Sequence, residues 1–256
     1  MTSTAVTAVP TTAGDTAAGT RGGPERAAAV LWDMDGTIVD TEPFFTAAVE
    51  DLVAAAGGTL TAGDRVALVG ANLWDVASIV RRAGVRRTRE QVVSEVSAAV
   101  RRRLSREVPW QPGARELLAG LRHLAVPTAL VTMSFRDVAE AVVAGIGFDA
   151  FDVVVTGDEV SEGKPDPEAY LRAAALLGVG IHRCVVVEDS PPGVAAGIAS
   201  GATVVAVPRY LPLPASADCT RWETLTGHDA SDLLDVTRLR APSRAGVTHP
   251  RSGGER

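Results

Sequence analysis

The sequence predicts an α/β protein with a doubly wound, Rossmann-like parallel-sheet core and a small all-helical cap domain inserted into that core. Two patterns support this fold class. Short, nearly continuous apolar runs alternate with longer segments of helical periodicity, as in parallel sheets that helices cover on both faces. Residues 57–106 carry helical periodicity alone and interrupt the alternation, so they indicate an insertion made of helices.

Five segments have the composition of buried strands. Each is short, rich in Val, Ala or Leu, and bounded by glycine, proline or polar residues. They are residues 27–33, 127–132, 151–157, 183–189 and 202–207. Because these runs are apolar on both faces, they predict a sheet buried between two layers of helices.

Five further segments have the periodicity of helices, and they alternate with the strands. They are residues 43–56, 113–123, 135–144, 166–177 and 191–200. The last begins with two prolines, which suit a first helical turn. We therefore predict a core at residues 27–42 and 107–237, a helical cap at 43–106, and disordered tails at 1–26 and 238–256.

Composition excludes several classes of function. The 256 residues carry a net charge of −6, so no general positive field favours nucleic acid or an anionic membrane as partner. No stretch approaches the roughly 18 apolar residues that a membrane-spanning helix needs. The N-terminal segment lacks the apolar centre of a secretory signal, and two cysteines cannot form a disulfide framework. We expect a cytoplasmic protein, either a monomer or a homodimer.

Two aspartates directly follow the first predicted strand, in the motif DMDGT at residues 33–37. In an open parallel sheet, ligands bind beyond the carboxyl ends of the strands. Asp33 and Asp35 can converge there on one cation, and Gly36 allows the chain to turn sharply away.

Polar groups also follow the second and third predicted strands. Thr132, Met133 and Ser134 follow the second strand, and they offer hydroxyls and the start of a helix to an anion. Lys164 follows the third strand and is the single lysine among 25 basic residues. A compact ammonium can contact a carboxylate and a phosphate oxygen together, in a geometry that a planar guanidinium does not offer.

The fourth predicted strand ends in two more carboxylates, Glu188 and Asp189. The carboxyl ends of parallel strands lie on the same rim of the sheet, so we expect these carboxylates to approach the DMDGT motif. Carboxylates, hydroxyls and one ammonium are the groups that bind Mg²⁺ and a phosphoryl group together.

Each signal alone has a structural explanation. The Asp-x-Asp-Gly pattern also occurs in calcium loops and plain turns, although a strand precedes it here. Thr132 and Ser134 could cap the next helix, and Lys164 could lie in a solvated loop. Glu188 and Asp189 could be acids at a helix start. Four signals at the ends of four strands favour a single site over four separate explanations.

These motifs resemble those of the haloacid dehalogenase-like hydrolase superfamily, in particular its phosphatase and β-phosphoglucomutase-like branch with a helical cap. The resemblance covers residues 28–207. The DMDGT segment looks like the first motif of the family and Thr132 like the second. Lys164 in GKPDPE looks like the third motif, and Glu188 with Asp189 looks like the fourth.

The resemblance implies a role for each of these residues. Asp33 would attack phosphorus and form an aspartyl-phosphate, and Asp35 would be the general acid and base. The groups expected to hold the phosphate are Gly36, Thr132, Met133, Ser134 and Lys164. The ligands expected for Mg²⁺ are Asp33, the backbone carbonyl of Asp35, and Asp189, with Glu188 adjacent or coordinating through water.

The predicted function is hydrolysis of a small phosphorylated metabolite, such as a sugar phosphate, phosphoglycolate or a polyol phosphate. Dehalogenases of the superfamily lack the second aspartate, so Asp35 favours phosphoryl chemistry. The alternative is a phosphosugar mutase, but the mutase branch typically has a histidine where this chain has Phe45. A third hypothesis is a non-catalytic protein that binds a phosphorylated ligand. We expect residues 68–74 of the cap to face the substrate.

Overall fold

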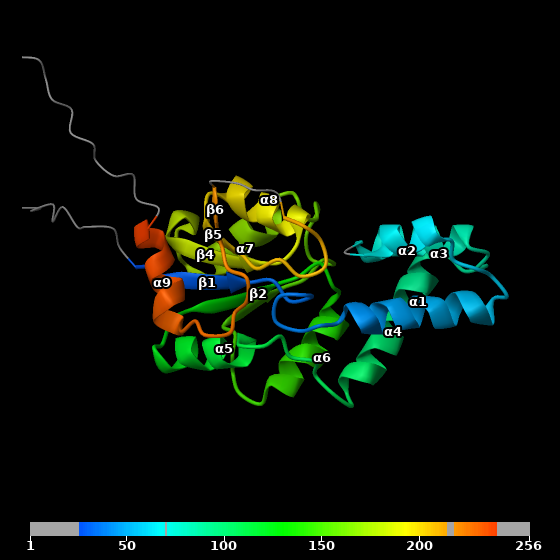
Figure 1. The fold of residues 1–256 in the computed structure, drawn as a ribbon, viewed down its shortest axis with the longest axis horizontal. Coiled ribbons are helices and arrows are strands. Elements are labelled where there is room, and N and C mark those ends of the chain that lie inside the picture. Colours follow the sequence, from blue (N-terminus) through cyan, green and yellow to red (C-terminus); the bar gives the residue numbers. More distant parts are fainter. Residues whose placement is uncertain (1–25, 70, 214–217, 240–256) are drawn as a thin grey trace, which may run out of the picture.

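The structure is a computed structural model that describes residues 26–69, 71–213 and 218–239 (Figure 1). The predicted tails lie outside the described residues, except for Arg26 and the last two residues of helix α9 (Ala230–Leu239). Within the described ranges, no helix has the length and apolar character that crossing a membrane requires.

In the part of the chain that the structure describes, six parallel strands form one sheet in the order β3-β2-β1-β4-β5-β6. The strands are β1 (Ala29–Trp32), β2 (Thr128–Val131), β3 (Val153–Val155), β4 (Cys184–Glu188), β5 (Thr203–Ala206) and β6 (Cys219–Arg221). From the centre of the sheet, the strand order is β1, β2, β3 toward one edge and β4, β5, β6 toward the other. Open α/β sheets bind ligands at such a reversal of strand order. The predicted fold class is confirmed.

Helices cover both faces of this sheet. One face packs against α5 (Ala114–His123), α6 (Arg136–Ile146) and α9, and the other against α7 (Glu168–Leu177) and α8 (Pro191–Ser200). Strand β1 shows why its sequence is continuously apolar. Val30 and Trp32 enter the first layer, whereas Ala29 and Leu31 enter the second. Both faces of the strand are therefore buried.

The apolar patterns of the sequence predict neither β6 nor α9. Strand β6 has only three residues, lies at the edge of the sheet, and is partly exposed, so it lacks the apolar run that marks a buried strand. Helix α9 buries Leu233, Leu234 and Val236 against the sheet, which completes a layer already begun by α5. Both elements depend on a surface that the rest of the chain provides.

In the described part of the chain, five helices lie between β1 and β2, and four of them precede α5. These four are α1 (Glu42–Ala55), α2 (Ala62–Leu68), α3 (Leu73–Arg82) and α4 (Arg89–Leu104). Helix α4 packs against α1 and α3 and also against α6 of the core. Figure 1 shows the four helices grouped beyond the end of β1. The described part of this stretch contains helices and no strands, whereas the cap boundaries at 43 and 106 stay a prediction.

The chain enters and leaves these four helices through two segments that lie side by side. Val39 pairs with Trp110 in an antiparallel bridge. The N–H of Asp40 donates to the carbonyl oxygen of Pro109 at 2.7 Å. We call the segment at residues 39–40 the first crossing and the segment at 109–110 the second crossing. Hydrogen bonds therefore join the two crossings close to the DMDGT motif.

Candidate active site

The DMDGT motif forms a tight turn at the end of the central strand. The N–H of Asp33 still belongs to the sheet, because it donates to the carbonyl oxygen of Val187 in β4 at 3.0 Å. Gly36 has a φ of 95°, a left-handed conformation that favours glycine. A Cβ at Gly36 would lie 2.1 Å from Oδ2 of Asp189. Glycine thus permits both the turn and the approach of the fourth motif.

Lys164 is a buried cation at the centre of the site. Its Nζ donates to Oδ1 of Asp33 and to Oε1 of Glu188, both at 2.6 Å, and to the carbonyl oxygen of Val131 at 3.0 Å. Its side chain is only 4% exposed. Burial opposes the charge, but Asp33 and Glu188 outweigh it and raise the pKa of Lys164 well above its usual value. The solvated-loop explanation for this lysine is therefore wrong.

Glu188 is fully buried and accepts hydrogen bonds on both carboxylate oxygens. Oε1 accepts from Lys164 and from the Tyr170 hydroxyl at 2.8 Å. Oε2 accepts from the N–H groups of Asp189 and Ser190, each at 3.1 Å, and from the Ser190 hydroxyl at 3.0 Å. These donors satisfy a charge that would otherwise be costly to bury.

Asp33, Glu188 and Asp189 form a buried acidic cluster, and each offers one oxygen within 4.8 Å of the others. Burial, followed by the charge of Glu188, raises the pKa of Asp33 to about 7, although Lys164 opposes the shift. Burial and the charge of Asp33 raise the pKa of Asp189 to about 9. Oδ2 of Asp33 is buried and has no hydrogen-bond partner among the described residues. Crowded carboxylates with an unsatisfied oxygen fit a metal ion.

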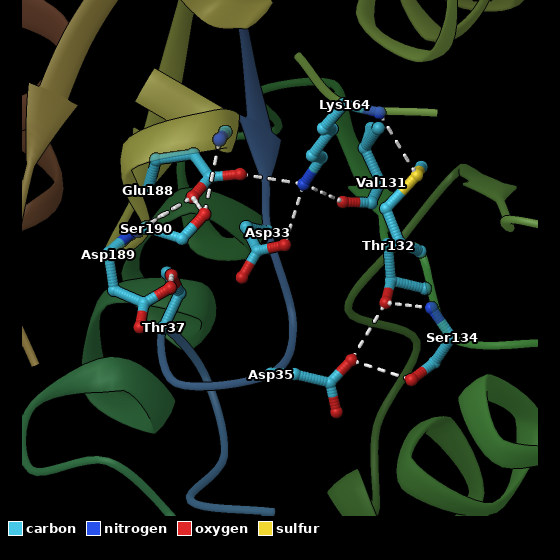
Figure 2. A network of polar contacts seen from close by, with 12 residues as sticks. Asp33, Asp35, Thr37, Val131, Thr132, Ser134, Lys164, Glu188, Asp189 and Ser190 are labelled. Carbon is cyan, nitrogen blue, oxygen red and sulfur yellow. Dashed lines mark hydrogen bonds and ion pairs between the residues drawn. The ribbon is translucent and has the colours of Figure 1, made fainter. Parts of the chain in front are cut away.

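Figure 2 shows Asp35 apart from this cluster, beside Thr132 and Ser134. Three hydroxyl groups donate to its carboxylate. Thr41 donates to its Oδ1 at 2.5 Å. Thr132 and Ser134 donate to its Oδ2 at 2.9 and 2.8 Å. The second motif and the second aspartate of the first motif, 97 residues apart, therefore meet directly.

The capping explanations for these motifs are not borne out. Helix α6 begins after Phe135 with no side-chain cap, so neither Thr132 nor Ser134 caps it. Helix α8 is capped by the Ser190 hydroxyl, which accepts from the N–H of Gly193 at 3.1 Å. The predicted residues of all four motifs instead meet on one rim of the sheet, as expected.

Outside the DMDGT motif, three described residues whose hydroxyls hold site carboxylates were not assigned to the site from the sequence. Thr41 holds Asp35, while Tyr170 and Ser190 hold Glu188. Ser190 follows the acidic pair directly, so its position was a usable signal. Tyr170 lies inside helix α7, and nothing in its sequence context distinguishes it from an ordinary buried aromatic residue.

A cleft of about 590 Å³ lies between the inserted helices and the core, and Lys164 lines it. The inserted helices contribute Asn72, Leu73 and Trp74, which belong to the predicted substrate-facing segment 68–74. Residue 70 of that segment lies outside the described residues. The Trp74 ring is 5.8 Å from that of Phe135 in the core, and the two sides therefore meet at an aromatic contact.

The parallel α/β fold and the acidic, lysine-containing site at its strand ends fit an enzyme of the hydrolase class. The family model of the haloacid dehalogenase-like hydrolases matches residues 27–201. The chain belongs to this haloacid dehalogenase-like hydrolase family.

Curated relatives agree with this assignment. The chain is 47% identical to hexitol phosphatase A of Escherichia coli (strain K12) over 96 residues, which span 38% of this chain and 44% of that protein. It is 34% identical to fructose-1-phosphate phosphatase YqaB of the same strain over 185 residues, which span 72% of this chain and 97% of that protein. The predicted enzyme class, a phosphoric monoester hydrolase, is confirmed.

A solved structure shares the fold. The crystal structure of CbbY from Rhodobacter sphaeroides in complex with phosphate superposes with a TM-score of 0.73. The superposition covers 81% of this chain and 99% of that chain at 23% identity. This likeness shows that the two chains share a fold.

Proposed function

We propose that this protein is a Mg²⁺-dependent phosphatase that hydrolyses a small phosphorylated metabolite through an aspartyl-phosphate on Asp33. One observation carries the proposal: the buried Asp33 has one oxygen paired with Lys164 and the other without a partner among the described residues, beside Asp189. The names of the two curated relatives support a sugar or polyol phosphate as the substrate.

The reaction has two steps. An oxygen of Asp33 forms a bond to phosphorus while the bond from phosphorus to the leaving oxygen breaks, and Asp35 gives a proton to that oxygen. Water then attacks phosphorus and gives a proton to Asp35, and the bond between Asp33 and phosphorus breaks. Thr132 and Ser134 donate to Asp35 in the structure, and a bound phosphate would offer these hydroxyls another acceptor.

Lys164 and the metal site balance the charge of the reacting groups. Asp33, Asp189 and the backbone carbonyl of Asp35 would hold Mg²⁺, which would offset repulsion between the aspartate and the phosphate dianion. The oxygens of Glu188 already accept from Lys164, Tyr170 and the start of α8. We therefore propose that Glu188 orients Lys164, and that any contact with the metal runs through water.

Phosphate release from a substrate panel tests the proposal. The panel contains hexitol phosphates, fructose 1-phosphate, phosphoglycolate and p-nitrophenyl phosphate, each with Mg²⁺ and with a chelator. We expect Mg²⁺-dependent release with one preferred sugar or polyol phosphate. Conversion of β-glucose 1-phosphate into glucose 6-phosphate without release would instead identify a mutase. A folded, Mg²⁺-binding protein that is silent on every substrate would support the non-catalytic hypothesis.

Mg²⁺ is expected to stabilise the protein more at about pH 8 than at about pH 6. The folded-state pKa values of Asp33 and Asp189 are raised, so without metal their contribution to stability is lost as pH rises through about 7 and 9. A bound cation would offset the repulsion between the ionised carboxylates of Asp33 and Asp189. At a concentration of 100 times its Kd, it would stabilise the folded state by about 2.7 kcal/mol.

Thermal unfolding with Mg²⁺ and with a chelator, at both pH values, measures this gain. Asp189→Asn is expected to lose most of the Mg²⁺-dependent gain, whereas Asp229→Asn, at an exposed position far along the chain, should retain it. An equal gain at the two pH values, or an undiminished gain in Asp189→Asn, would contradict the proposed metal site. The cytoplasmic location and the monomeric or homodimeric state stay predictions.

A further inference from the structure

Two residues beyond β5 contact the first crossing between the core and the inserted helices. Nη2 of Arg209 donates to Oδ2 of Asp40 at 2.8 Å, and the Tyr210 hydroxyl donates to the other oxygen of Asp40. The Arg209 guanidinium also lies 5.4 Å from the centre of the Tyr210 ring. Both residues lie outside the family match, which ends at residue 201.

Asp40 occupies a junction in the fold. Its backbone N–H is tied to Pro109 in the second crossing, as described above. The next residue, Thr41, is fully buried and donates to Oδ1 of Asp35. Asp40 therefore contacts the second crossing through its backbone and the segment at 209–210 through its side chain. Through its neighbour Thr41 it is also linked to the carboxylate of Asp35.

The segment at 209–210 also reaches the rim of the active site. Tyr210 and Leu211 line a small pocket together with Asp35, Gly36 and Asp189. The pocket has a volume of about 40 Å³ and opens beside the predicted general acid. Partial burial and the acceptor Asp40 raise the pKa of Tyr210 to about 12. A tyrosine hydroxyl is in any case protonated at neutral pH, so it is available as a donor.

We propose that Arg209 and Tyr210 are positioning residues that hold Asp40 and thereby orient Asp35 through Thr41. The Asp40 side chain is 23% exposed, so without these donors it could turn to water and release the crossing from the core. A displaced Thr41 would then lose its hydrogen bond to Asp35. Small errors in the position of a catalytic group lower the rate of reaction strongly. This inference rests on the proposed role of Asp35 as general acid.

The test compares Tyr210→Phe with the wild-type enzyme on two substrates. An alkyl phosphate, such as a hexitol phosphate, needs a proton on its leaving oxygen, whereas p-nitrophenolate leaves without one. Tyr210→Phe keeps the aromatic ring and removes the hydrogen bond to Asp40. We expect kcat/KM to fall about tenfold for the alkyl phosphate and less than about threefold for p-nitrophenyl phosphate. Asp35→Asn should show the same selectivity with a larger loss.

A double variant distinguishes an effect on the position of Asp35 from a general disturbance of the active site. In the Asp35→Asn background, Tyr210→Phe should change kcat/KM little, because the group that it positions is absent. Asp235→Asn is the matched control for Asp40→Asn, since Asp235 also pairs with arginine at the surface, and it should leave both substrates unaffected. Asp40→Asn should reproduce the selective loss.

The outcomes distinguish this inference from the proposed function. An inactive wild-type protein would overturn the proposed function itself. An active wild-type protein whose Tyr210→Phe variant loses nothing, or loses equally on both substrates, would overturn the positioning role alone. Full additivity of Tyr210→Phe with Asp35→Asn would also overturn it.

Discussion

Asp33→Asn is expected to lower phosphate release by about 10⁴-fold or more, while the protein stays folded. A carboxamide has nearly the volume of a carboxylate but is a poor nucleophile, so the covalent step is lost. Stability should not suffer, because the raised pKa of Asp33 indicates that its charge is unfavourable in the folded, metal-free protein. Asparagine keeps an oxygen that can accept from Lys164.

The measurement is initial-rate phosphate release, accompanied by a thermal unfolding curve in chelator. Mass spectrometry should check that the new asparagine has not deamidated to aspartate. Asp152→Asn serves as a control, since Asp152 forms an ion pair with Arg122 at 2.8 Å far from the strand-end rim. Turnover near the wild-type rate in folded Asp33→Asn would refute the aspartyl-phosphate mechanism.

Lys164→Met is expected to lower kcat by about 10²–10³-fold, as loss of a preorganised charged donor does elsewhere. It should also destabilise the fold by about 3–5 kcal/mol, because Asp33 and Glu188 would lose their buried partner. The loss of stability should be larger at about pH 8 than at about pH 6, since the carboxylates take up protons as pH falls.

Urea unfolding at the two pH values, in chelator, measures this loss. Arg87→Met is the matched control: its ion pair with Glu95 is exposed, so removal should cost less than about 1 kcal/mol. Adding Asp33→Asn to Lys164→Met should restore part of the stability, because one of the crowded charges is gone. A Lys164→Met variant as stable and as active as the wild type would show that the buried ion pairs contribute neither to the stability of the fold nor to kcat.

The grouping of polar residues on one rim of the sheet could be predicted because it depends on local patterns and one topological rule. Asp33, Thr132, Lys164 and Asp189 each follow an apolar strand in the sequence, and parallel strands present their carboxyl ends on the same side. The structure brings these residues together, although their catalytic roles stay proposals. Tyr170 could not be predicted, because only the position of α7 against the sheet brings its hydroxyl to Glu188.

The partners of Asp35 show the same limit. Its hydrogen bond to Thr41 is local in sequence, but those to Thr132 and Ser134 cross from β1 to the end of β2. The contacts of Asp40 with Arg209 and Tyr210 join residues 169 and 170 positions apart, from a segment with no recognisable motif. Such contacts follow from how loops pack on the finished sheet.

The sequence by itself determined the order of the first five strands and the helices that alternate with them, the helical character of the insertion and the identity of the groups at the strand ends. These features follow from apolar periodicity and from residue chemistry, which are properties of short segments. Only the tertiary structure decided which ionisable groups lie close enough to form ion pairs and to shift the pKa values of one another. A pKa of about 7 for Asp33 arises from burial and from Glu188, and both depend on distances between atoms that lie far apart along the chain.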